Sequence, residues 1–75
     1  MTLHVAIYLY PDVEVLDFAG PFEVFTTATR MHARREPNVA PLFATFTVAR
    51  STVPVRARAG LVVQPDHALC DAPPI

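Results

Sequence analysis

The sequence has a single cysteine, only two glycines, no tryptophan and no lysine among its 75 residues. One cysteine excludes a disulfide within these residues and any zinc site built from several cysteines. No run of about 18 apolar residues is present, so no segment is predicted to span a membrane. A charged start followed by an apolar core and a small-residue cleavage site is also missing. We therefore expect a soluble, cytoplasmic protein.

The charge is nearly balanced, because six arginines face seven acidic residues and the formal net charge is −1. This balance does not favour direct contact of the segment with nucleic acid. The three histidines are scattered: His4 lies in an apolar run, whereas His32 and His67 lie in segments typical of solvated surface. Metal ligands normally show tighter spacing on one face of an element, so we predict no metal site.

A βαβ unit is predicted in the first fifty residues. Residues 3–9 form an apolar run, rich in Val, Ile and Tyr, that is typical of a strand buried on both faces. Residues 42–49 are dense in aromatic and β-branched residues and predict a second strand. Apolar residues between them recur with a helical period. A strand, a helix and a strand in this order predict two parallel strands.

The predicted helix runs from about Ala19 to Met31, frays over the next residues and ends at Glu36-Pro37. Asp17 precedes the periodic run and Pro21 follows shortly after, which is typical of a helix N-terminus. The expected apolar face consists of Phe18, Phe22, Phe25 and Thr29, widened by Val24, Ala28 and Met31.

The last third predicts a small hairpin, with residues 55–58 and 61–64 as its strands and Ala59-Gly60 as the break between them. Arg56 and Arg58 are expected on its exposed face. Residues 67–70 can make one helical turn, and residues 71–74 are expected to lead into another strand. Cys70 lacks a glycine-flanked turn and has Asp71 beside it, which disfavours a thiolate, so we interpret it as a small apolar filler.

One stretch also resembles a known family. A hydrophobic strand and Tyr10-Pro11-Asp12 are followed by Leu16-Asp17-Phe18-Ala19-Gly20-Pro21-Phe22-Glu23-Val24-Phe25. This stretch resembles the opening of the ThiJ/PfpI superfamily, which has a class I glutamine amidotransferase-like fold, and is closest to its isonitrile hydratase and AraC-type regulator branches. The pattern Leu-Asp-x-x-Gly-Pro-x-Glu-Val-Phe fixes seven positions. The resemblance continues through residues 48–55, 60–63, 65–66 and 71–75.

The resemblance implies a doubly wound, flavodoxin-like parallel sheet. Residues 1–75 would be the N-terminal portion of a single such domain, a β-α-β unit plus a small hairpin, with the sheet incomplete. In the family, the acidic residue at the position of Asp17 lies beside a nucleophilic cysteine on a sharp strand-to-helix turn, and that cysteine is absent from these residues.

In isonitrile hydratase relatives this arrangement adds water to an isonitrile carbon and gives an N-substituted formamide, without a metal or an organic cofactor. Asp17 is therefore the predicted catalytic acid–base partner. Gly20 is a candidate for substrate binding, because glycine allows a close approach of the backbone to a pocket.

Two alternatives remain open. Instead of a hydratase, the chain would be the ligand-sensing domain of an AraC-type transcription regulator, in which a DNA-binding helix-turn-helix module follows, or an inactive truncated copy. In each active case the expected partner is a small molecule, and a homodimer is an option. The isolated chain is expected to be inactive because it lacks the nucleophile. A chain of this length buries only about 60% of its unfolded surface, so we also expect marginal stability.

Overall fold

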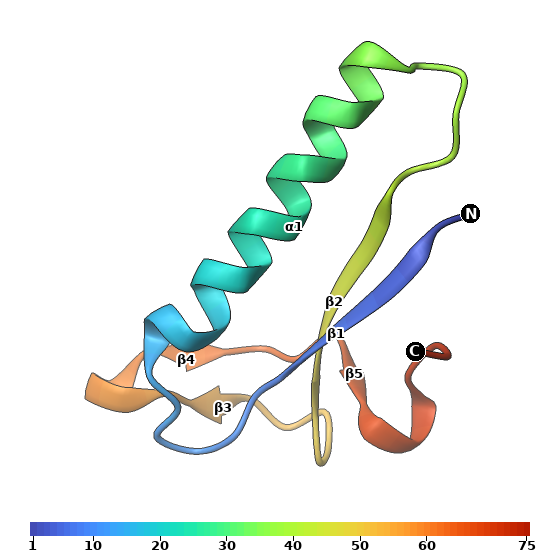
Figure 1. Cartoon of the computed structure of the whole chain (residues 1–75). Coiled ribbons are helices and arrows are strands. Elements are labelled where there is room, and N and C mark those ends of the chain that lie inside the picture. The colour runs from blue at the N-terminus through green and yellow to red at the C-terminus, as the bar shows by residue number, and fades with distance from the viewer.

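The chain has a mixed α/β architecture in the computed structural model, which describes all residues 1–75 (Figure 1). In chain order the elements are β1 (Leu3–Tyr8), α1 (Val15–Arg35), β2 (Phe43–Ala49), β3 (Val55–Arg56), β4 (Val62–Val63) and β5 (His67–Ala68). Short 3₁₀ turns span Arg58–Gly60 and Leu69–Asp71. The predicted parallel βαβ unit and the small hairpin are confirmed.

The strands form one parallel and one antiparallel sheet. β1, β2 and β5 are parallel neighbours in the order β1-β2-β5, whereas β3 pairs with β4 in an antiparallel hairpin. In Figure 1 the single helix α1 lies along one side of the β1 and β2 ribbons, and the hairpin lies near its N-terminal end. The sheet is therefore open, with a helix on one face only.

The core lies between α1 and the face of the sheet that carries Val5 and Ile7. Ile7 is paired with Thr47 in the parallel register, and paired residues of neighbouring strands point to the same face. One cluster joins this face to α1 and the hairpin, and its buried members are Ile7, Leu9, Val13, Phe18, Ala49, Val55 and Ala57. Farther along the helix, the rings of Phe25 and Phe43 meet edge to face with their centroids 4.9 Å apart.

The opposite face of the sheet has no helix over it, yet Phe46 on β2 is buried. His4 and His67 meet its ring edge-on, with centroid distances of 6.3 and 5.4 Å. The Nδ1 atom of His4 also lies 2.5 Å from the carbonyl oxygen of Pro74. Because His4 is on β1 and β5 is on the far side of β2, the last residues of the chain return across this face of the sheet to reach His4.

The first strand is less buried than the sequence predicts. Tyr8 is exposed because it lies on the face of the sheet that has no covering helix, whereas Leu3 is exposed as the first residue of this edge strand. The expectation of a strand buried on both faces is therefore wrong for β1. On α1, Val24 and Met31 are exposed, so they do not widen the buried stripe as predicted.

The helix begins at Val15, four residues earlier than predicted, and Glu14 is its N-cap in an extended conformation without a side-chain capping bond. Asp17 is therefore inside the first turn, and Pro21 lies inside the helix. Proline has no backbone N–H, so the carbonyl of Asp17 lacks its usual helical donor at Pro21. The helix ends at Arg35 before Glu36, as the following proline predicts. No helix of the chain is long and apolar enough to cross a membrane.

The C-terminal segment also differs from the prediction. His67-Ala68 is a short strand that pairs with Val48 and Ala49, and only Leu69–Asp71 makes a helical turn. Residues 72–75 are not part of a strand. The reason for the strand at His67 is nonlocal: the neighbouring Asp66 is bonded to Thr47 of β2 through both its side chain and its backbone.

Candidate functional site

The carboxyl ends of β1 and β2 lie side by side, because the two strands are parallel and paired over their full common length. A backbone bond from the Leu9 amide to the Val48 carbonyl, 2.7 Å long, continues the pairing just past Tyr8. In open parallel sheets, ligands bind outside the carboxyl ends of the strands. This edge is therefore the first place to look for a site.

The chain turns sharply between β1 and α1. The Val13 amide donates to the Tyr10 carbonyl at 3.1 Å, and Asp12 adopts a left-handed conformation with φ of 67°. Aspartate is among the few non-glycine residues that adopt this conformation readily. The turn carries Val13 into the core, where it is almost fully buried, and sets the start of α1 beside the end of β1.

The hairpin holds this junction in place. The Asp12 amide donates to the Arg56 carbonyl at 2.9 Å, and the Arg58 amide donates to the Val13 carbonyl at 3.0 Å. An ion pair of 3.2 Å joins the Arg58 guanidinium to the Glu14 carboxylate, although both side chains are well exposed and contribute little energy. The start of α1 is thus fixed by backbone bonds to β3 and its following turn.

Asp17 lies in the first turn of α1 and is exposed. Its amide donates to the Glu14 carbonyl at 3.0 Å, whereas its carboxylate belongs to neither of the two ion pairs of the chain. Within these residues, the predicted catalytic carboxylate is accessible and has no partner.

Gly20 lies in the same helix and is half-buried. A Cβ atom built at this position would meet no atom within 4 Å. No contact among residues 1–75 therefore requires glycine here. The assignment of Gly20 to substrate binding stays a prediction about a surface that faces open space in this chain.

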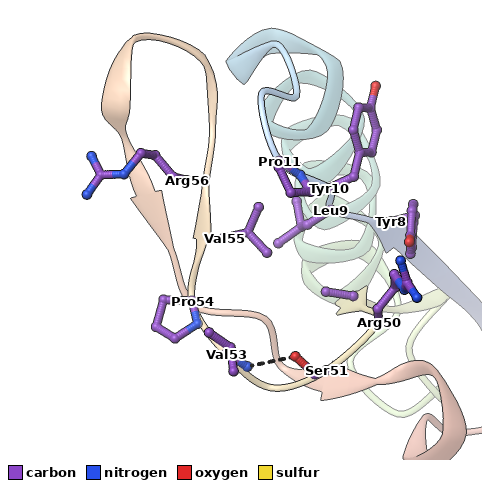
Figure 2. Close-up of a pocket in the computed structure, with 11 residues that line it drawn as sticks. Tyr8, Leu9, Tyr10, Pro11, Arg50, Ser51, Val53, Pro54, Val55 and Arg56 are labelled. Carbon is purple, nitrogen blue, oxygen red and sulfur yellow. Dashed lines mark hydrogen bonds between the residues drawn. The ribbon is translucent and has the colours of Figure 1, made fainter.

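A cavity of about 330 Å³ lies at the carboxyl edge of the sheet, between the ends of β1 and β2 and the hairpin (Figure 2). Its lining residues are Tyr8, Leu9, Tyr10, Pro11, Ala49, Arg50, Ser51, Val53, Pro54, Val55 and Arg56. It contains arginine but no acidic side chain. Asp17 is not among the residues that line it.

No protein-family model and no curated protein matches this chain. The functional argument therefore depends on the geometry of these residues and on the motif around Asp17.

A second cavity, of about 380 Å³, runs between the N-terminal half of α1 and the segment that follows β4. Phe18, Phe22 and Glu23 line it from the helix, and Thr47 and Asp66 from the opposite side. The Asp66 carboxylate accepts a 2.9 Å bond from the Thr47 amide, and the Asp66 amide donates to the Thr47 hydroxyl at 2.9 Å. Asp66 is thus engaged in holding the sheet together.

The histidines and the cysteine form no metal centre, since no group of three or more His, Cys, Asp or Glu side chains lies close enough to hold an ion. His32 and His67 are half-buried, which corrects their assignment to solvated surface. His67 packs against Phe46, and the Nδ1 atom of His32 is buried without a hydrogen-bond partner. Cys70 is exposed in the turn Leu69–Asp71, so its interpretation as a buried filler is wrong.

The sequence reasoning missed the cavity residues Tyr8 and Arg50. A signal for them was present, because each lies at the carboxyl end of one of two strands that were predicted to be parallel. Polar and aromatic side chains at such positions share one edge of the sheet, where ligands are expected. Arg56 was assigned to the exposed face of the hairpin, and this is confirmed.

Proposed function

We propose that the chain is the front part of a ThiJ/PfpI-type domain and that the whole domain is a cofactor-free hydratase similar to isonitrile hydratase. Asp17 would be its proton-handling carboxyl group, paired with a cysteine outside residues 1–75. The observation that carries the proposal is the placement of an accessible, unpartnered Asp17 at the start of the helix that follows β1.

The strand order is compatible with a doubly wound sheet, although it does not favour the flavodoxin-like variant, in which the third parallel strand pairs with the first strand and not with the second. The order β5-β2-β1 corresponds to the 3-2-1 half of a doubly wound sheet, in which the next strand pairs with the free edge of the first. Here β1 pairs with β2 only, so its other edge is free. A further strand at that edge would create a switch-point crevice at the carboxyl end of β1, next to the turn that leads to Asp17.

The exposed surface supports a larger domain. The radius of gyration is 13.5 Å, against about 11 Å for a compact chain of this length. The accessible surface is 5239 Å², against about 4,500 Å² for a folded monomer of this mass. Leu16, Val24 and Met31 on α1 are exposed as well. Further elements packed on the sheet and on α1 would cover this surface.

The proposed chemistry follows from the pairing of a carboxyl group with a thiol. A cysteine attacks as the thiolate, and an ionised carboxylate beside it would repel that anion. A protonated Asp17 would instead donate a hydrogen bond to the thiolate and later deliver its proton to the substrate. Attack of the thiolate on the isonitrile carbon and protonation of that carbon would give a thioimidate. Water would then add to the thioimidate carbon, and cleavage of the carbon–sulfur bond would release the N-substituted formamide and the free thiol.

The proposal is tested by extending the reading frame beyond Ile75 and measuring formamide production by the protein that it encodes. We expect a strand with a glycine pair and then a cysteine flanked by small residues. In that protein, Asp17→Asn should abolish turnover and leave the fold intact. Glu23→Gln is the matched control, since Glu23 also lies exposed on α1 but pairs with Arg30 at 3.7 Å. Turnover by the Asp17 variant at the unmodified rate would overturn the assigned role.

A further inference from the structure

The cavity at the carboxyl edge of the sheet has a basic side chain without a partner. Arg50 directly follows β2 and lines the cavity, and it takes part in neither ion pair, since these join Arg30 to Glu23 and Arg58 to Glu14. No acidic residue lines the cavity. A positive cavity on a chain whose net charge is −1 favours an anionic ligand.

Arg56, the other arginine of the lining, is engaged elsewhere. Its guanidinium donates to the Gly60 carbonyl at 3.3 Å. Figure 2 shows its side chain directed away from Leu9 and Tyr10, on the outer side of the hairpin. Arg50 is therefore the one guanidinium available at the cavity, which fits a ligand with a single negative charge.

Ser51 provides a further polar group in the lining of the cavity. Its Oγ accepts a hydrogen bond from the Val53 amide at 3.3 Å, as the dashed line in Figure 2 marks. A hydroxyl that accepts a bond still has its own proton to donate. For the guanidinium of Arg50, a planar carboxylate with two oxygens is the matching partner.

The rest of the lining suits a flat apolar group. The rings of Tyr8 and Tyr10 are stacked, with centroids 6.0 Å apart and planes inclined by 25°, and both are partly exposed. Leu9, Ala49 and Val55 are buried and form an apolar floor. Aromatic side chains of this kind favour stacking and edge contacts with another ring. The volume of about 330 Å³ is at the small end of the range for ligand pockets.

We propose that this cavity binds a small aromatic carboxylate, with the carboxylate on Arg50 and the ring against Tyr8, Tyr10 and the apolar floor. Asp17 does not line the cavity, so the proposal uses none of the residues assigned to the hydratase activity. The existence of the site does not depend on the proposed hydratase activity.

Tyrosine fluorescence can report binding at this site. It has no tryptophan and two tyrosines, and both tyrosines line the cavity. Benzoate is the probe ligand and benzamide its neutral analogue of the same shape. We expect benzoate to change the tyrosine fluorescence saturably, and benzamide to bind at least about tenfold more weakly, because it cannot form the charge-assisted bonds to Arg50.

Two variants separate the site from general charge effects. Arg50→Gln should weaken benzoate binding about tenfold or more, whereas Arg35→Gln, which changes the charge equally at the far end of α1, should leave it unchanged. Both side chains are exposed, so neither substitution disturbs the core.

A second measurement detects binding even when the isolated chain is only partly folded. A ligand that binds only the folded state raises the folded fraction, so benzoate should increase the helical circular dichroism of such a chain and benzamide should not. The proposal is overturned by the absence of a saturable response to benzoate in both readouts. Equal binding of benzamide, or unchanged benzoate binding by the Arg50 variant, would overturn it as well.

Discussion

Replacing two nearby leucines by alanine should change the stability by very different amounts, because Leu9 is 1% exposed and Leu16 is 80% exposed. Leu9→Ala removes three buried carbons, worth about 2.4 kcal/mol at about 0.8 kcal/mol each. The cavity that remains adds to this, so the expected loss is about 2.5–4 kcal/mol. Leu16→Ala removes the same atoms, mostly from water, and alanine is the better helix former, so its expected cost is at most about 0.5 kcal/mol.

This loss is large compared with the stability expected for the chain. A chain of this length has a free energy of unfolding of about 4–11 kcal/mol, and with 12 of 75 residues buried we expect a value near the lower limit. In urea titrations followed by far-ultraviolet circular dichroism, Leu9→Ala should therefore lose most or all of its cooperative transition. Leu16→Ala should keep the transition of the unmodified chain. Similar losses at both positions would refute the core described here.

Two further substitutions test local features by the same titrations. Ala59 has a φ of 65°, a conformation that glycine adopts more easily than alanine, so Ala59→Gly should raise the free energy of unfolding by about 0.5–1 kcal/mol. The control Ala33→Gly lies inside α1 and should lower the free energy of unfolding by up to about 1 kcal/mol. Stabilisation by both substitutions, or by neither, would contradict this expectation. Asp66→Ala should lower the free energy of unfolding by about 1–3 kcal/mol, because the Thr47 amide loses its hydrogen-bond acceptor. Asp66→Asn should lower it less, because the asparagine side chain keeps an oxygen at that position. An equal loss for both variants would contradict the role of this bond.

The strands that the sequence predicted well are those whose residues favour a strand locally. The runs at residues 3–9 and 42–49 differ from β1 and β2 by one residue each, because β-branched and aromatic side chains mark both. β5 was missed, since a strand of two residues at His67 depends on the bonds between Asp66 and Thr47, which are distant in the sequence. Hydrogen bonds between residues this far apart leave no periodic pattern in the sequence.

The helix start shows a conflict between two local signals. Asp17 and Pro21 both favour a helix that begins after Asp17, yet α1 begins at Val15 because Asp12 and Val13 are bonded to the hairpin. The position of Asp17 near a helix N-terminus could be predicted from sequence. The cavity beside Arg50 could be predicted only as an edge of the sheet, because its shape depends on how the hairpin packs there.

The bonds between the β1–α1 turn and the hairpin also have a consequence for the order of folding. They join Asp12 and Val13 to residues more than forty positions later in the chain. Closing a loop of that length costs about 3 kcal/mol of chain entropy. Helix α1 forms its bonds locally and needs no such closure. We therefore expect the turn that precedes Asp17 to become ordered late, after the hairpin has formed, with its contacts largely absent from the folding transition state.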